Sequence, residues 1–226
     1  ARADIVLILD SDMGVAPSDA TKFVAALARG KGEMKAHDVE SLIREMPGQG
    51  AEDSRPMVEQ LARLLRILNY LPKPTVARVN GAAFGGGLGL IACCDVAVAV
   101  DSARFALTEV RLGLAPAVIS PYVFRRIGEA QARRYFLTGE RFDATHARRI
   151  GLVHEICPAA ELDATVNAFS RRLLAGGPEA LRHCKALAFH AGGHSADTQL
   201  EQDQVTARLI ANLRTSAEGQ EGMRAF

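Results

Sequence analysis

The 226-residue sequence contains no Trp, and aromatic residues make up only 5% of it. This scarcity argues against a surface on which the bases of single-stranded nucleic acid stack. An excess of charge of either sign is also missing, because 27 Lys and Arg residues nearly balance 26 Asp and Glu residues, for a formal net charge of +1. Without a positive field that attracts phosphates, we expect binding neither to nucleic acid nor to an anionic membrane surface.

Long hydrophobic runs are absent as well. The longest, residues 91–100, is interrupted by Asp95 and is too short for the roughly 20 residues of a membrane-spanning helix. No pattern of a secretory signal peptide opens the sequence. We therefore expect a cytoplasmic protein without a membrane partner.

Only four cysteines occur, and they show neither Cys-x-x-Cys spacing nor a disulfide-dense pattern. Zinc ribbons and secreted disulfide scaffolds are therefore excluded, and we expect the cysteines to be small buried apolar residues. Six histidines without His-Glu-x-x-His spacing predict no metal site. The Gly-x-Ser-x-Gly nucleophile elbow of serine hydrolases is also absent.

What is present is the composition of an ordinary globular domain, with 48% hydrophobic and 23% charged residues. An apolar periodicity of three and four residues predicts a helix over residues 57–71. Short β-branched runs predict strands over residues 75–79 and 95–100, and residues 196–226 read as helical. Alternating strands and helices imply an α/β core with parallel strands and a helical C-terminal appendage.

A glycine triplet, Gly85 to Gly87, lies between a predicted strand and a predicted helix. Three glycines in a row leave backbone N–H groups accessible to an oxygen of a ligand. The triplet has three interpretations: tight packing between strand and helix, a dinucleotide-binding loop, or an oxyanion hole at the start of the helix. The dinucleotide fingerprint is poorly matched, because residues 81–84 separate the glycines from the strand.

The sequence around the triplet carries a resemblance. The segments PKPTVARVNGAAFGGGLGLIACCDVAVAVDSARFALTEVRLGL and ISPYVFRRIGEAQARRYFLTGERFDATHARRIGLVHEICP resemble the enoyl-CoA hydratase/isomerase, or crotonase, superfamily. The resemblance covers roughly residues 57–226, about three quarters of the chain. Within the superfamily, the stretch AVISPYV is most similar to the 3-methylglutaconyl-CoA hydratase group.

This resemblance implies a crotonase-like spiral of repeated β-β-α units with a C-terminal helical region that forms trimers or hexamers. Its expected boundaries are residues 1–176 for the α/β core, with a divergent or shortened segment at 1–56, and residues 177–226 for the helical region. The implied partner is an acyl-CoA thioester substrate, and no cofactor is expected beyond the coenzyme A of that substrate.

The resemblance also implies roles for individual residues. The Gly86 amide would donate to the thioester oxygen, flanked by Gly85 and Gly87, and Glu109 would be the catalytic carboxylate. The second glutamate of two-carboxylate hydratases falls on Gly89, which cannot move a proton. Lys185, on a predicted C-terminal helix, is expected to reach the CoA phosphates.

A second oxyanion donor is expected near the N-terminal segment. The best match to the family pattern is Lys35-Ala36-His37-Asp38, in which the His37 amide would donate, Asp38 would anchor the turn and Ala36 would lie against the substrate. The expected activity is hydration of a 2-enoyl-CoA, branched or of the 3-methylglutaconyl type. Two alternatives stay open: an enoyl-CoA isomerase that uses one acid, and a non-catalytic acyl-CoA-binding member.

Overall fold

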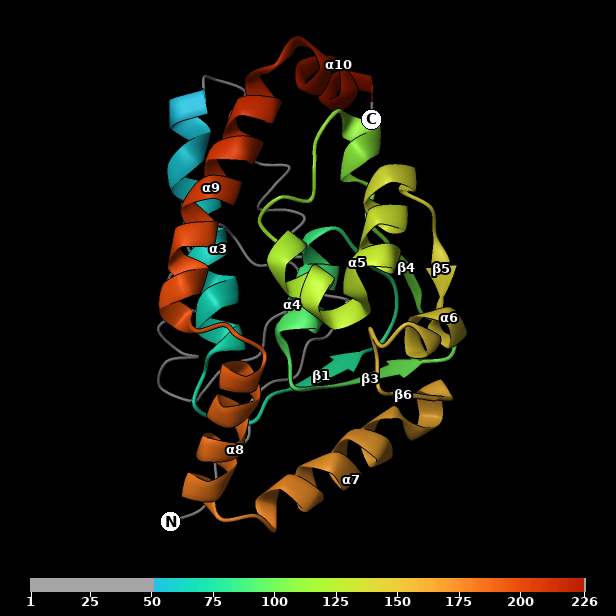
Figure 1. Cartoon of the computed structure of the whole chain (residues 1–226). Coiled ribbons are helices and arrows are strands. Elements are labelled where there is room, and N and C mark those ends of the chain that lie inside the picture. The colour runs from blue at the N-terminus through green and yellow to red at the C-terminus, as the bar shows by residue number, and fades with distance from the viewer. Residues whose placement is uncertain (1–50, 226) are drawn as a thin grey trace.

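Figure 1 shows the computed structural model of the chain, which describes residues 51–225, with side chains described from residue 58 onward. The first described element, the helix α3 (Ala51–Asn69), extends the predicted helix toward the N-terminus. Its apolar residues recur on one face, and Leu64, Leu65 and Leu68 are among the most buried side chains of the core. Pro72 and Pro74 follow in the next segment, where the helix has ended.

Two successive turns of chain repeat the same order of strand, short strand and helix. The elements of these turns are β1 (Val76–Val79), β2 (Ala83–Phe84), α4 (Gly86–Cys93), β3 (Val96–Val100), β4 (Arg104–Ala106), the 3-10 helix η1 (Glu109–Leu112) and α5 (Ser120–Thr138). The first strands of the turns pair in parallel, and so do the second strands. The predicted spiral of β-β-α units is therefore what the described part of the chain forms.

The register of the two small sheets shows how the turns stack. In the first sheet, ordered β1-β3-β6, Val76 lies opposite Val96, and β3 pairs in parallel with β6 (Glu155–Cys157). In the second sheet, ordered β2-β4-β5, Ala83 lies opposite Phe105. Among the strands in residues 51–225, only β5 (Phe142–Asp143) runs antiparallel, next to β4. The parallel pairing predicted from the sequence is confirmed for β1, β3 and β6.

The N-terminus of α5 lies one residue earlier than the sequence predicts. The pair Ser120 and Pro121 predicts an N-cap followed by the first helical residue, but Ile119 is the N-cap and Ser120 already belongs to the helix. The reason is that the Ser120 hydroxyl donates back to the Ala117 carbonyl, at 2.7 Å, instead of accepting from the helix. The helix bends at Gly128, whose φ of 76° and ψ of 163° are not helical.

The C-terminal part of the chain is helical, as predicted. It contains α6 (Ala144–Arg149), α7 (Leu162–Leu174), α8 (Pro178–Ala191), α9 (Ala196–Thr215) and α10 (Ala217–Ala225). Figure 1 shows α7 along the first sheet and α9 beside α3, and both arrangements are tertiary contacts. Between α3 and α9, Arg66 Nε donates to the buried Asp203 carboxylate at 2.9 Å. The helical region thus packs directly on the core.

The cysteines follow the expectation in three of four cases. Cys93, Cys94 and Cys157 are buried, and burial raises the pKa of Cys94 to about 12. Cys184 is exposed on α8, so the expectation of burial is wrong there. That helix has no fully buried residue, because it lies on the surface of the core.

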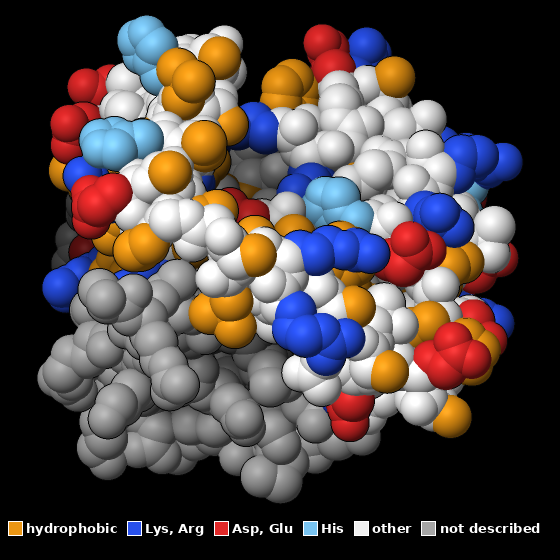
Figure 2. All heavy atoms as spheres, turned by 90° about the horizontal axis from the view of Figure 1, so that it is seen from below, with side chains coloured by type: hydrophobic (Ala, Val, Ile, Leu, Met, Phe, Trp, Pro, Cys, Tyr) orange, Lys and Arg blue, Asp and Glu red, His pale blue; other side chains and the backbone are white. Residues whose placement is uncertain are grey.

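The surface mixes both signs of charge where it can be seen. Figure 2, which views the molecule from below, shows Lys and Arg side chains interspersed with Asp and Glu. Such a face resembles an ordinary solvated surface more than a continuous basic surface that binds a polyanion such as nucleic acid. None of the helices in residues 51–225 is apolar over a stretch long enough to cross a bilayer.

Candidate active site

The site is built where the short strand β2 leads into α4. Gly85 follows β2 with a φ of 48° and a ψ of −119°, a conformation that glycine adopts without steric cost. Its N–H donates to the Ala106 carbonyl of β4 at 3.0 Å, which ties the loop to the neighbouring strand. The turn is therefore held in place by the second sheet.

The N-terminus of α4 presents backbone donors at this turn. The N–H groups of Leu88 and Gly89 already bond to the Gly85 carbonyl, at 3.0 and 3.3 Å. Gly86 and Gly87 are the first two helical residues, and an α-helix offers no acceptor for amides in these positions. All residues of α4 are buried, so the positive end of this helix lies in a region of low dielectric.

Glu109 faces the turn from the start of η1. A Cβ atom built on Gly85 would lie 3.1 Å from Glu109 Oε1 and 3.6 Å from Glu109 Cδ. The Glu109 residue is half-buried, and its Oε2 atom has almost no exposure to solvent. Gly85 and Glu109, 24 positions apart in the sequence, are thus close together in space, and the carboxylate lies at the turn that leads into α4.

The helix η1 is fixed on both sides. Gly113 ends it in the left-handed conformation, with a φ of 67°, and the Leu114 N–H donates to the Glu109 carbonyl at 3.0 Å. On its outer side α10 packs against it so closely that a Cβ atom on Gly222 would meet the Leu112 main chain, with Cα at 2.9 Å. The C-terminal helix therefore supports the backbone that carries Glu109.

Gly89 lies one helical turn beyond Gly85, and its surroundings differ. A Cβ atom at this position would collide with the side chain of Ile119, whose Cβ would be only 2.7 Å away. No sequence pattern gives Ile119 a role at the site; it stands only within the stretch AVISPYV.

Lys185 lies elsewhere, between α8 and the start of the first sheet. Its Nζ donates to Asp95 Oδ2 at 2.8 Å and to the Lys73 carbonyl at 3.1 Å, and its side chain is only 9% exposed. The same Asp95 oxygen accepts from the Thr75 N–H at 2.7 Å. Contact between Lys185 and CoA phosphates stays a prediction.

The sequence also predicts a second oxyanion donor. His37, Ala36 and Asp38 lie outside the described residues, as does nearly all of the segment 1–56. The structure therefore brings together Gly85, Gly86, Gly87 and Glu109, with Gly89 one turn away.

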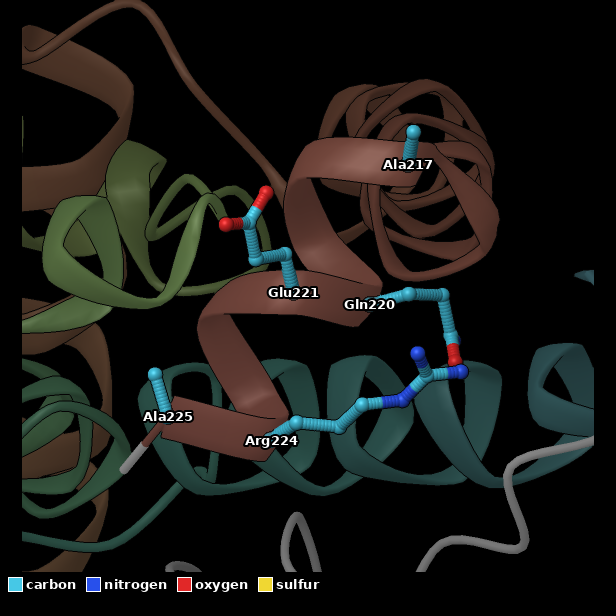
Figure 3. Close-up of a pocket in the computed structure, with 5 residues that line it drawn as sticks. All are labelled: Ala217, Gln220, Glu221, Arg224 and Ala225. Atoms are coloured by element: carbon cyan, nitrogen blue, oxygen red, sulfur yellow. The ribbon is translucent and has the colours of Figure 1, made fainter.

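Other hollows on the described surface have different linings. One lies at α10 and is lined by Gln220, Glu221 and Arg224 with two alanines (Figure 3). Another, beside β5, contains Arg104, Arg134 and Arg141 around the Tyr135–His146 pair. Within residues 51–225 no group of three or more His, Cys, Asp or Glu side chains could hold a metal ion.

The arrangement around Gly86 has a definite chemical capacity. Amides at a helix N-terminus stabilise negative charge that develops on a carbonyl oxygen. A carboxylate beside them can take a proton from one atom of a bound molecule and return it to another. Together they suit proton transfer next to an activated carbonyl group.

Comparison with known proteins agrees with this chemistry. The family model described as enoyl-CoA hydratase/isomerase matches residues 34–226. A crotonyl-CoA hydratase from Syntrophomonas wolfei is 30% identical over 186 residues, which are 81% of this chain and 70% of the relative. A short-chain-enoyl-CoA hydratase from Clostridium acetobutylicum is 29% identical over 222 residues, or 91% and 84% of the two chains.

Solved structures show the same architecture. The crystal structure of an enoyl-CoA hydratase from Shewanella pealeana superposes with a TM-score of 0.69 at 34% identity. The match covers 99% of this chain and 90% of that one. The fold is thus the crotonase-like spiral expected from the sequence, whereas these matches do not single out a 3-methylglutaconyl-CoA subgroup.

Proposed function

Because the chain belongs to the enoyl-CoA hydratase/isomerase family, we propose that it adds water to a 2-enoyl-CoA thioester through the Glu109 carboxylate and an oxyanion site that includes the Gly86 amide. The observation that carries this proposal is the position of Glu109, close to Gly85, the N-cap of α4. The His37 amide is the second donor in this proposal, with Ala36 and Asp38 next to it.

The reaction needs one group to move a proton twice. Glu109 takes a proton from water while the water oxygen bonds to the β-carbon of the substrate. The electron pair of the carbon–carbon double bond shifts toward the thioester, and the Gly86 N–H stabilises the resulting charge on its oxygen. The protonated Glu109 then gives its proton to the α-carbon. The sum is the addition of one water, and no cofactor takes part.

Replacement of the carboxylate tests this mechanism. Glu109→Gln keeps the shape of the side chain but cannot accept a proton, so the rate of crotonyl-CoA hydration should fall about 10²–10⁴-fold. The rate is followed by the absorbance of the enoyl thioester. The control is Glu129→Gln, because Glu129 on α5 is 67% exposed and should leave the rate unchanged. Turnover that survives Glu109→Gln would remove Glu109 from the mechanism.

The acyl group is the finer part of the proposal. A branched or carboxylated enoyl-CoA, such as 3-methylglutaconyl-CoA, is proposed because of the similarity of the AVISPYV stretch to that group. Comparison of kcat/KM for crotonyl-CoA and 3-methylglutaconyl-CoA tests it. A clear preference for crotonyl-CoA would contradict this choice of substrate and leave the hydration mechanism intact.

Isomerisation is the second candidate, and one observation favours it. Glycine at position 89 leaves a single carboxylate in the described part of the site, and moving a double bond requires only one group that shuttles a proton. The mass of the product separates the two reactions, because hydration adds one water and isomerisation adds nothing. Tight binding of acyl-CoA without any turnover would instead indicate a non-catalytic binding protein.

A homotrimer or hexamer is the proposed assembly. Large apolar side chains are exposed on α5 and α9, among them Phe124 at 45% and Val205 at 66%. Both line one groove between these helices. Exposed apolar surface of this kind is a common mark of an interface. Light scattering should give the mass of three or six chains, and Val205→Glu should shift it toward one chain.

A further inference from the structure

Ile119 fills the space that a side chain at position 89 would need. A Cβ atom built on Gly89 would overlap the Ile119 Cγ2 methyl group and lie 2.7 Å from Ile119 Cβ. Only Ile119 Cα, at 3.8 Å, would be at an ordinary contact distance. Ile119 is the N-cap of α5 and is 3% exposed, so the closely packed interior around it leaves little freedom to move.

Gly89 belongs to α4, whereas Gly85 precedes this helix in a conformation that is not helical. The Gly89 N–H donates to the Gly85 carbonyl at 3.3 Å, so the two residues lie about one turn apart. Glu109 lies next to position 85, and Ile119 fills the space at position 89. A side chain at position 89 would therefore enter the volume that Ile119 now occupies, about one turn from the residue next to which Glu109 lies.

We propose that Ile119 is the residue that limits this site to a single carboxylate, because its side chain and any side chain at position 89 exclude each other. The catalytic meaning of this exclusion rests on the proposed function. Glycine at position 89 alone would leave an opening that solvent or a substituted side chain could fill. The aliphatic side chain of Ile119 fills this space instead. In the proposed mechanism Glu109 is then the group that both accepts and returns the proton.

The exclusion can be tested without any assay of activity, because the effect of Gly89→Ala on Tm should change sign between two backgrounds. Alanine normally stabilises a helix relative to glycine. In the wild-type background Gly89→Ala should nevertheless lower Tm, since its methyl group meets Ile119. In the Ile119→Gly background the same change should raise Tm, because only Ile119 Cα remains nearby. An equal loss of Tm in both backgrounds would overturn the proposal.

Ile119→Ala serves as the graded control. It removes Cγ2 but keeps the Cβ atom at 2.7 Å, so Gly89→Ala should still lower Tm in this background, by less than in the wild type. This arm also decides the question if Ile119→Gly fails to fold. A loss in the Ile119→Ala background as large as in the wild type would count against Ile119 as the obstacle.

The catalytic consequence has a separate readout. Gly89→Glu combined with Ile119→Gly should hydrate crotonyl-CoA at least about 10-fold faster than Ile119→Gly alone, because a second proton-transfer group is admitted. No gain, with the reversal of Tm present, would overturn the claim that the exclusion limits catalysis. Absence of turnover in the wild type would refute the proposed function instead, and the Tm series would still decide whether Ile119 excludes a side chain at position 89.

Discussion

The Glu109 carboxylate lies against Gly85, the residue that precedes the N-terminus of α4, with Oε1 3.1 Å from the position of a Cβ atom on that glycine. Two features of the structure disfavour a side chain at position 85. Its φ of 48° and ψ of −119° are costly for other residues, and the carboxylate occupies the adjacent space. The backbone turn that exposes the amides and the approach of the Glu109 carboxylate therefore depend on the same residue.

Gly85→Ala should damage both stability and catalysis. The backbone conformation alone should cost about 1–3 kcal/mol of the free energy of unfolding. The new methyl group should also push the Glu109 carboxylate away from the amides, so kcat for crotonyl-CoA should fall at least about 10-fold because small displacements of a reacting group are costly. Urea denaturation and steady-state kinetics measure the two effects.

Gly128→Ala provides the matched control for Gly85→Ala. Gly128 also has a positive φ, 76°, but a Cβ atom there would have nothing within 4 Å. It should lower stability by a similar amount and leave kcat unchanged. If both variants lose the same activity, the effect of Gly85→Ala is due to general destabilisation and not to displacement of Glu109.

Gly222→Ala tests whether α10 positions the carboxylate from outside. The added methyl group would meet the main chain of Leu112, at 2.9 Å from its Cα, so α10 has to move away from η1. We expect a lower kcat with little change in KM, since Glu109 begins η1. Gly177→Ala is the control, because its nearest neighbour, Ala180 Cβ, would be 3.9 Å away. An unchanged kcat in Gly222→Ala would show that α10 has no influence on Glu109.

The longer elements of the fold could be predicted from the sequence, and the shortest could not. β1 and β3 are rich in Val and extend over four and five residues, with Arg78 the one charged residue in β1, and this is enough for them to be recognised. The strands β2 and β4 contain two and three residues, too few for a periodicity. They exist because the spiral brings their backbones side by side, which is a property of the tertiary structure.

The candidate site shows the same division. The glycine triplet stands out as a local motif, and the role of Glu109 is implied by the resemblance to the crotonase superfamily. The contact between Gly89 and Ile119 joins positions 30 residues apart, and no local pattern encodes it. The pairing of Lys185 with Asp95 likewise depends on how α8 packs against the first sheet. The sequence therefore predicts candidate reacting groups, but not the residues that shape the space around them.

Lys185→Met should destabilise the protein. It leaves the Asp95 carboxylate, which is 28% exposed, without its ammonium partner, and we expect a loss of about 1–3 kcal/mol in the free energy of unfolding. Arg182→Met on the same helix is the control, because its partner Glu179 is 76% exposed and should contribute under about 1 kcal/mol. Equal losses would contradict a structural role for Lys185. A higher KM for acyl-CoA in Lys185→Met alone would support its predicted contact with CoA.

The His154 ring should make stability depend on pH in the weakly acidic range. Its Nδ1 accepts from the Ala97 N–H at 2.9 Å, and although the residue as a whole is exposed, partial desolvation of the ring, followed by nearby Arg126, lowers the pKa of His154 below its ordinary value of 6.5. The unfolded chain therefore binds a proton more readily than the folded protein. The free energy of unfolding should be highest above pH 6.5 and should decrease as the pH falls through the folded pKa.

His154→Asn keeps an acceptor near Ala97 but does not titrate, so urea denaturation between pH 5 and pH 8 should show a shallower decrease. Parallel curves for the two proteins would assign the pH dependence to other groups, such as His146 or His194, whose pKa values burial also lowers.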